Sequence, residues 1–469
     1  MLRSALLVLS GNTAAAIMGL ARNLAVASLI PVPDYGIAAT FAVVTAIIEM
    51  ATAFGLQQQI IQAKDGDDPA LQAGLQGFQL VRGVIASVML FVIASPMAAF
   101  LRVPEVTWAY QLMAVTPMLN ALQHFDMHRL TRKGRFGPMI LSGTLPAALS
   151  LAAIWPLAVW LGDFRVMLYA IIAQAVATAI LSHLTAERRY RASLDRAVIR
   201  RGLGFGWPLM LNNILLFGVF NGDKLIIGRE LGLEALAIFA MGLTLTLPPT
   251  LVLTRSMQNI FLPALSRAQG DADRFRRLAA ATLQATALMG LALATGIFFV
   301  GEWLIDGLFA EKYAALLPLL GWLALVQALR MIKAGPATVA LAVGETRNAM
   351  FTNVPRVALL AVAWGVAMTT GDLQLVILVG LGAEAIGLLL AFALLHRSVG
   401  AAALVAWSTV AAVIAGLGLL ALWGLLRPDN PGAVPPPWWL TGLLAALAGP
   451  AIWRAAELRN YVRQHRRKR

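Results

Sequence analysis

The feature that most constrains this chain is a long succession of apolar stretches, each about as long as a bilayer is thick. A membrane-spanning helix needs about 20 mostly apolar residues. We find fourteen such stretches, at residues 6–30, 36–61, 77–101, 108–125, 137–161, 166–185, 204–227, 233–262, 278–299, 314–343, 350–368, 373–395, 404–426 and 438–455. The sequence therefore predicts an all-α polytopic membrane protein with about 14 transmembrane helices.

Composition excludes the main alternatives. Of the 469 residues 59% are hydrophobic and 13% are charged, whereas a soluble domain carries about 25% charged residues. The chain has no cysteine, which excludes disulfides, a thiolate nucleophile and cysteine-ligated metals. The five histidines are scattered without metal-ligand spacing. We therefore expect no catalytic site, no metal site and no nucleic-acid partner.

The distribution of positive charge tests this topology, because cytoplasmic loops carry an excess of Lys and Arg. With the N-terminus inside, 26 of the 37 Lys and Arg residues fall in inner segments, five in outer loops and six within spans. This asymmetry predicts that both termini are cytoplasmic. Most of the formal net charge of +14 is therefore interpreted as the excess of Lys and Arg in cytoplasmic loops.

A weak repeat suggests two related halves. The segment 22–61 resembles the segment 223–262, and the offset covers six helices, so both copies have the same orientation. We expect two pseudo-symmetric six-helix lobes, at residues 1–195 and 196–397. Residues 398–469 are then helices 13 and 14 and a basic cytoplasmic tail.

Charged residues within spans are the candidate functional residues, because an ionisable group near the bilayer centre costs at least about 2.5–3.5 kcal/mol. Two interpretations remain open for each one: a structural ion pair or snorkelling side chain, or a group that lines a hydrated cavity. The excess of cations favours a positive cavity and an anionic substrate, since guanidinium groups bind phosphate in bidentate fashion. The in-span cations are Arg22, Arg82, Lys224, Arg255, Arg330 and Lys333, and the main in-span acids are Glu49 and Glu384.

Three stretches resemble a known family. RNLAVASLIPVPDYGIAATFAVVTAIIEMATAFGLQQQIIQ, NGDKLIIGRELGLEALAIFAMG and LFAEKYAALLPLLGWLALVQALR are similar, in order and spacing, to segments of the polysaccharide (O-antigen type) flippases. These belong to the multidrug/oligosaccharidyl-lipid/polysaccharide exporter superfamily. The resemblance implies two six-helix lobes, often with two extra helices. It also implies transport of undecaprenyl-diphosphate-linked sugars across a bacterial inner membrane, as in lipopolysaccharide and exopolysaccharide synthesis.

The resemblance also assigns roles. Arg22 and Arg255 fall where cavity cations occur in such proteins, and we expect both, together with Arg330 and Lys333, to bind the diphosphate. Arg82 and Lys224 are further substrate-binding candidates. Glu49 or Glu384 is expected to take up a coupling proton or sodium ion, and no cofactor is expected.

Alternatives remain. A lipid II flippase is disfavoured because its fuller set of N-terminal arginines is missing, and a multidrug/cation antiporter is disfavoured by the cation excess and the fourteen spans. A membrane polymerase or ligase needs a large outer loop, which this chain lacks. The expected partners are a polyprenyl-diphosphate-linked glycan, membrane lipid, and the polysaccharide polymerase and chain-length machinery.

Overall fold

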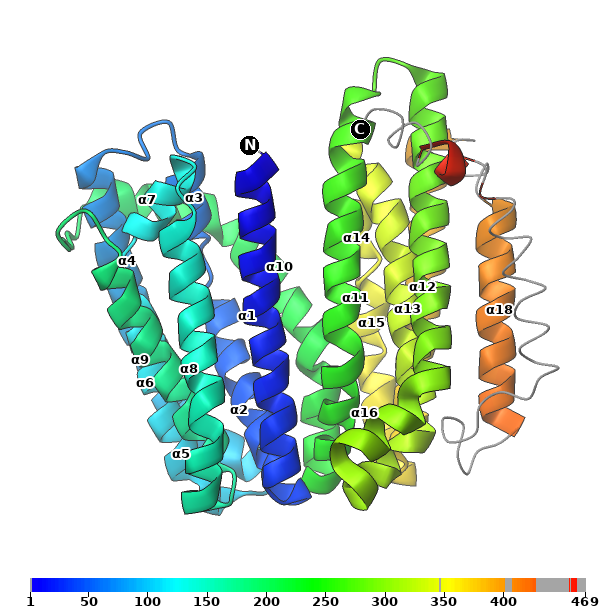
Figure 1. The fold of residues 1–469 in the computed structure, drawn as a ribbon, viewed down its shortest axis with the longest axis horizontal. Helices are drawn as coiled ribbons and strands as arrows, with labels where there is room; N and C mark the ends of the chain where they lie inside the picture. The colour runs from blue at the N-terminus through cyan, green and yellow to red at the C-terminus, as the bar shows by residue number, and fades with distance from the viewer. Residues whose placement is uncertain (1, 346, 401–406, 427–454, 456, 462–469) are drawn as a thin grey trace. The chain divides into compact units, whose positions relative to one another are not determined.

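The structure is a computed structural model that describes residues 2–345, 347–400, 407–426, 455 and 457–461. Its packing divides the chain into two compact units, Met1–Ala237 and Ile238–Arg469. Throughout the described residues every regular element is helical (Figure 1). The prediction of an all-α fold is confirmed.

The first unit is built from helices of very unequal length. They are α1 (Leu2–Leu29), α2 (Val32–Ala51), α3 (Leu56–Gln62), α4 (Pro69–Phe100), the 3₁₀ turn η1 (Pro104–Val106), α5 (Thr107–Met113), α6 (Val115–Ala121), α7 (Asp126–Arg132), α8 (Gly137–Leu161), α9 (Arg165–Leu184) and α10 (Arg196–Glu230). Helix α8 packs against α1 and α9, and α4 packs against α5 and α6. Helix α10 packs against α2 and α4, so it belongs to this unit.

The second unit is also built from helices of unequal length. Its helices are α11 (Leu233–Arg267), which begins in the first unit, α12 (Ala272–Phe309), the 3₁₀ segment η2 (Ala310–Leu316), α13 (Leu317–Ala342), α14 (Arg347–Phe351), α15 (Val354–Ala358), α16 (Leu360–Thr370), α17 (Leu373–Val399) and α18 (Trp407–Leu426). Helix α13 lies at the centre of the packing, because it contacts both α12 and α17 extensively.

Many of these helices are suited to a bilayer. Within the described residues ten are long and apolar enough to cross it, and two shorter apolar segments accompany them. Helix α8 shows why: large apolar side chains on its outer face, among them Trp155 and Trp160, are left exposed by the protein. An apolar surface of this kind, on helices long enough to cross a bilayer, is suited to contact with lipid. The chain is thus a multi-pass membrane protein.

The structure interrupts three of the predicted spans. The span at 36–61 is divided into α2 and α3, the span at 108–125 into α5 and α6, and the span at 350–368 into α14, α15 and α16. Broken helices in a membrane are tolerated where protein or water satisfies the freed backbone groups. The stretch at 438–455 lies almost wholly outside the described residues, so the count of fourteen and the cytoplasmic termini stay predictions.

Local chemistry explains where several helices begin and end. Asp68, Asp195 and Asp372 each occupy the N-cap position and accept hydrogen bonds from backbone N–H groups one turn on, which satisfies donors that have no helical partner. Gly162 and Gly371 end α8 and α16 in the left-handed conformation, which glycine adopts without steric cost. The lobes at 1–195 and 196–397 were predicted from a sequence repeat. The division into packing units does not test that repeat, so the lobes remain a prediction.

Candidate functional site

Arg22 and Glu49 line the same cavity in the first unit, which we call the Arg22 pocket. It has a volume of about 330 Å³ and lies among α1, α2, α5, α6 and α9. Arg22 donates to Oε1 of Gln174 at 2.5 Å, and Glu49 accepts from Nδ2 of Asn120 at 3.0 Å. Each charge is therefore held by a neutral amide, and within the described residues the two do not form an ion pair with each other.

Arg82 lines a second cavity in the same unit, of about 260 Å³. Its Nη1 donates to the backbone oxygen of Thr52 at 3.1 Å, just beyond the end of α2. Lys224, on α10, donates to Oδ1 of Asn221 at 3.5 Å, one turn earlier on the same helix. The structure thus brings Arg22 and Glu49 into one pocket and gives Arg82 a separate one.

In the second unit, Glu384 forms ion pairs with two of the predicted cations, Arg330 and Lys333. This carboxylate is completely buried on α17 and accepts from Nε of Arg330 and from Nζ of Lys333, each at 2.7 Å. Arg356 on α15 adds a third cation at 3.8 Å. Lys333 also donates to Asn353 at 3.1 Å, at the break between α14 and α15. We call these residues the Glu384 cluster.

The Glu384 cluster has two more positive charges than negative ones. Coulomb attraction to one carboxylate offsets only part of the cost of burying three cations. Helix α17 admits Arg356 because Gly380 lies opposite it: a Cβ there would be 2.4 Å from Nη1. Arg330 and Lys333 are therefore ion-pair partners of Glu384.

Arg255 stands apart from these groups. Its side chain is exposed on α11, and within the described residues it has no hydrogen bond or ion pair. The structure therefore places the six predicted cations in several separate environments rather than in one shared contact network.

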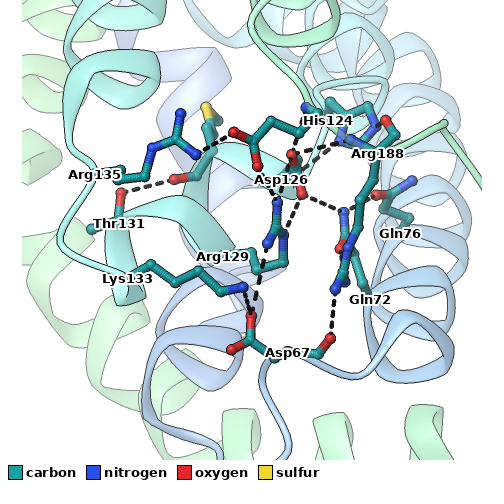
Figure 2. Close-up of polar contacts among 12 residues, drawn as sticks. Asp67, Gln72, Gln76, His124, Asp126, Arg129, Thr131, Lys133, Arg135 and Arg188 are labelled. Carbon is teal, nitrogen blue, oxygen red and sulfur yellow. Dashed lines mark hydrogen bonds and ion pairs between the residues drawn. The ribbon is translucent and has the colours of Figure 1, made fainter.

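A polar network that was not predicted surrounds Asp126, at the end of the first unit that is predicted to be cytoplasmic. Figure 2 shows Asp126, which is fully buried, paired with Arg129 at 2.5 Å. Its Oδ2 also accepts from the backbone N–H of Glu187 at 2.8 Å, and Arg188 donates to Oε1 of Gln72 at 2.9 Å. The network therefore fastens the segment 185–195, which joins α9 to α10, onto α4 and α7.

The surroundings of Asp126 stabilise the ionised form of its carboxyl group. Burial alone raises the pKa of Asp126, but hydrogen bonds from Arg129 and from the backbone of Glu187 outweigh it and lower the pKa to about 2. The i,i+3 spacing of Asp126 and Arg129 is a signal in the sequence. The contacts to Glu187 and Arg188, about 60 residues later, leave no such signal.

The fold is that of known transporters. A multidrug resistance MATE family transporter of the MOP superfamily, in an inward-facing conformation, aligns with 83% of this chain and 95% of its own at a TM-score of 0.70 and 14% identity. The lipid II flippase MurJ aligns with 97% of this chain and 99% of its own at a TM-score of 0.68 and 13% identity. The chain therefore shares the fold of these MATE and MurJ structures.

The sequence identifies the family. Residues 25–318 match the family of polysaccharide biosynthesis proteins, and the chain belongs to that family. The teichuronic acid biosynthesis protein TuaB of Bacillus subtilis is 22% identical over 70% of this chain and 68% of its own length. The lipopolysaccharide biosynthesis protein WzxC of Escherichia coli is 20% identical over 67% of this chain and 64% of its own. The predicted relationship to polysaccharide biosynthesis proteins is confirmed.

Proposed function

We propose that this protein is a flippase that moves undecaprenyl-diphosphate-linked oligosaccharide from the cytoplasmic to the periplasmic leaflet of a bacterial inner membrane. Family membership supports the cargo class, and the likeness to MATE and MurJ structures supports transport by alternating access. The completed glycan then serves a polysaccharide polymerase and its chain-length machinery. A proton or sodium ion, taken up at Glu49 or Glu384, is the proposed coupling ion.

The observation that carries the proposal is a buried cation beside a cavity in an apolar helix bundle. The guanidinium of Arg22 lines the Arg22 pocket, and its close partners are neutral. Buried positive charge is stabilised by an anion that brings its own oxygen acceptors. A diphosphate headgroup fits this requirement, while a cationic drug is repelled by it.

The proposed substrate-binding roles differ with the environment of each cation. Arg22 and Arg82 line cavities and are available to a headgroup directly. Arg330 and Lys333 share Glu384, so a diphosphate would compete with that carboxylate for them. Arg255 and Lys224 add positive charge from α11 and α10.

An in-cell assay of polysaccharide export tests the proposal. Arg22→Ala and Arg255→Ala are compared with Arg274→Ala, which removes an exposed arginine near the start of α12. We expect the first two variants to export much less polysaccharide at normal protein levels, while lipid-linked repeat units accumulate, and the control to export normally. Normal export by both the Arg22→Ala and the Arg255→Ala variant would contradict the cation assignment. Drug resistance in place of glycan export would favour the multidrug antiporter.

A further inference from the structure

The second cavity of the first unit lies where a membrane helix is interrupted. Helix α2 ends at Ala51, α3 begins at Leu56, and the intervening backbone turns through Gly55, whose φ is 63°. We call the cavity of about 260 Å³ beside this interruption the break pocket. An interruption of this kind exposes backbone carbonyls, which need partners in a membrane.

Helix α10 closes one side of the break pocket at very short range. A Cβ on Gly206 would lie 2.2 Å from the backbone oxygen of Phe54, so only glycine allows this approach. Leu209 and Asn213, one and two turns further along α10, line the pocket itself. The pocket is therefore a built feature of the packing between α2, α3, α4 and α10.

The lining of the break pocket is unusually rich in carboxamides. Gln57 and Gln58 come from α3, Gln79 from α4 and Asn213 from α10, with Arg82 as the single charged group. Gln79 is only 6% exposed. The Nε of Arg82 is buried without a hydrogen-bond partner among the described residues.

Unsatisfied polar groups in a buried position are costly, at about 1–3 kcal/mol each, unless a ligand or water satisfies them. Carboxamides carry both donors and acceptors, so they match hydroxyl groups, which also donate and accept. A guanidinium matches phosphate oxygens. An amide-rich pocket with one arginine therefore fits a sugar joined to a phosphate better than it fits a phosphate alone.

We propose that the break pocket binds the sugar residue next to the diphosphate, with Arg82 on a phosphate oxygen and the amides of Gln58 and Gln79 on sugar hydroxyls. This inference rests on the proposed function and adds to it: the pocket makes recognition depend on the glycan as well as on the lipid diphosphate. Arg82 acts on any diphosphate lipid, whereas the amides act only on a glycosylated one.

The test measures binding of two lipids to the purified full-length protein in detergent by native mass spectrometry. The lipids are undecaprenyl diphosphate and undecaprenyl diphosphate that carries one hexose. We expect Gln79→Leu to weaken binding of the hexose-bearing lipid about tenfold and to leave the bare diphosphate lipid within twofold. Arg82→Gln is expected to weaken both, and Gln374→Leu, a glutamine of the second unit, to change neither.

A second variant guards against misfolding at the buried position. Gln58 is exposed, so Gln58→Leu tests the same prediction with little strain on the fold. Selective loss of the hexose-bearing lipid in both glutamine variants supports the inference. Equal affinity changes for the two lipids in Gln58→Leu, or none, would overturn it. If the unaltered protein bound neither lipid better than undecaprenol, the proposed function itself would be contradicted.

Discussion

Lys333 on α13 and Glu384 on α17 are 51 residues apart in sequence and form a 2.7 Å hydrogen-bonded ion pair in the interior of the second unit. Glu384 is completely buried and holds Arg330 and Arg356 as well. Removal of the carboxylate leaves three neighbouring cations without their common counter-charge. The pair therefore ties α13 to α17 through a buried charge.

The Glu384 cluster gives a first prediction about stability. Glu384→Gln keeps the shape of the side chain and removes its charge, and we expect the free energy of unfolding to fall by about 3–5 kcal/mol. Lys333→Met in the same chain removes one uncompensated cation and is expected to restore part of the loss. Thermal unfolding in detergent measures both. A Glu384→Gln protein as stable as its parent would contradict the cluster.

The contact between α10 and the helix interruption gives a second prediction. Gly206→Ala forces a methyl group against the backbone oxygen of Phe54, so we expect a loss of about 1–3 kcal/mol. Gly204 on the same helix is a matched control, because a Cβ there meets nothing within 4 Å. Gly204→Ala should be neutral or slightly stabilising. Denaturation midpoints of the two variants that coincide would refute the close approach.

A third prediction concerns pH. His128 lies on α7, outside the spans, and burial lowers its pKa to about 4 from an ordinary value of 6.5. The unfolded state therefore binds a proton before the folded state does, so stability falls as the pH drops from about 6.5 to about 4, by up to roughly 3 kcal/mol. His128→Phe should weaken this dependence in melting curves between pH 7 and pH 4. A parent protein with a flat profile over that range would show the assignment to be wrong.

Asp126 titrates at lower pH than His128, so the contributions of the two residues to the pH dependence of stability can be separated. Its folded pKa of about 2 lies below the ordinary value of 3.8, so its contribution is complete above about pH 4 and is lost as the pH falls toward 2. The decline between pH 6.5 and pH 4 is therefore expected to persist in an Asp126→Asn variant.

The Asp126 network gives a fourth prediction. Asp126→Asn should loosen the segment 185–195 and speed its cleavage by trypsin, because a buried ion pair loses one partner. Asp65→Asn breaks an exposed bidentate pair with Arg201 and should change stability by less than about 1 kcal/mol. Limited proteolysis of both variants gives the comparison. Equal cleavage rates would mean that the network does not fasten this segment.

The sequence predicted the elements better than the contacts between them. Apolar length predicts helices such as α8 and α12 directly, because the bilayer thickness sets that length. The in-span position of Arg330 and Glu384 was also visible. Their pairing was not, because it depends on how α13 and α17 pack, and nothing local in the sequence encodes that packing.

The helix interruptions were hidden for a related reason. Residues 36–61 read as one apolar stretch, and the interruption at Gly55 depends on α10, which approaches through Gly206 about 150 residues later. The Asp126 network likewise depends on a segment some 60 residues away. Local pattern therefore predicts which residues are in the membrane, while tertiary packing decides which charges are free to bind a ligand.

The most direct test of the account is transbilayer movement in proteoliposomes of a fluorescent polyprenyl-diphosphate oligosaccharide. We predict that the protein accelerates its movement over protein-free liposomes, that Arg22→Ala lowers the rate at least tenfold, and that Arg274→Ala leaves it unchanged. No acceleration by the unaltered protein, or an Arg22→Ala rate equal to the parent rate, would contradict the claim that cations inside the helix bundle carry a lipid-linked diphosphate across the membrane.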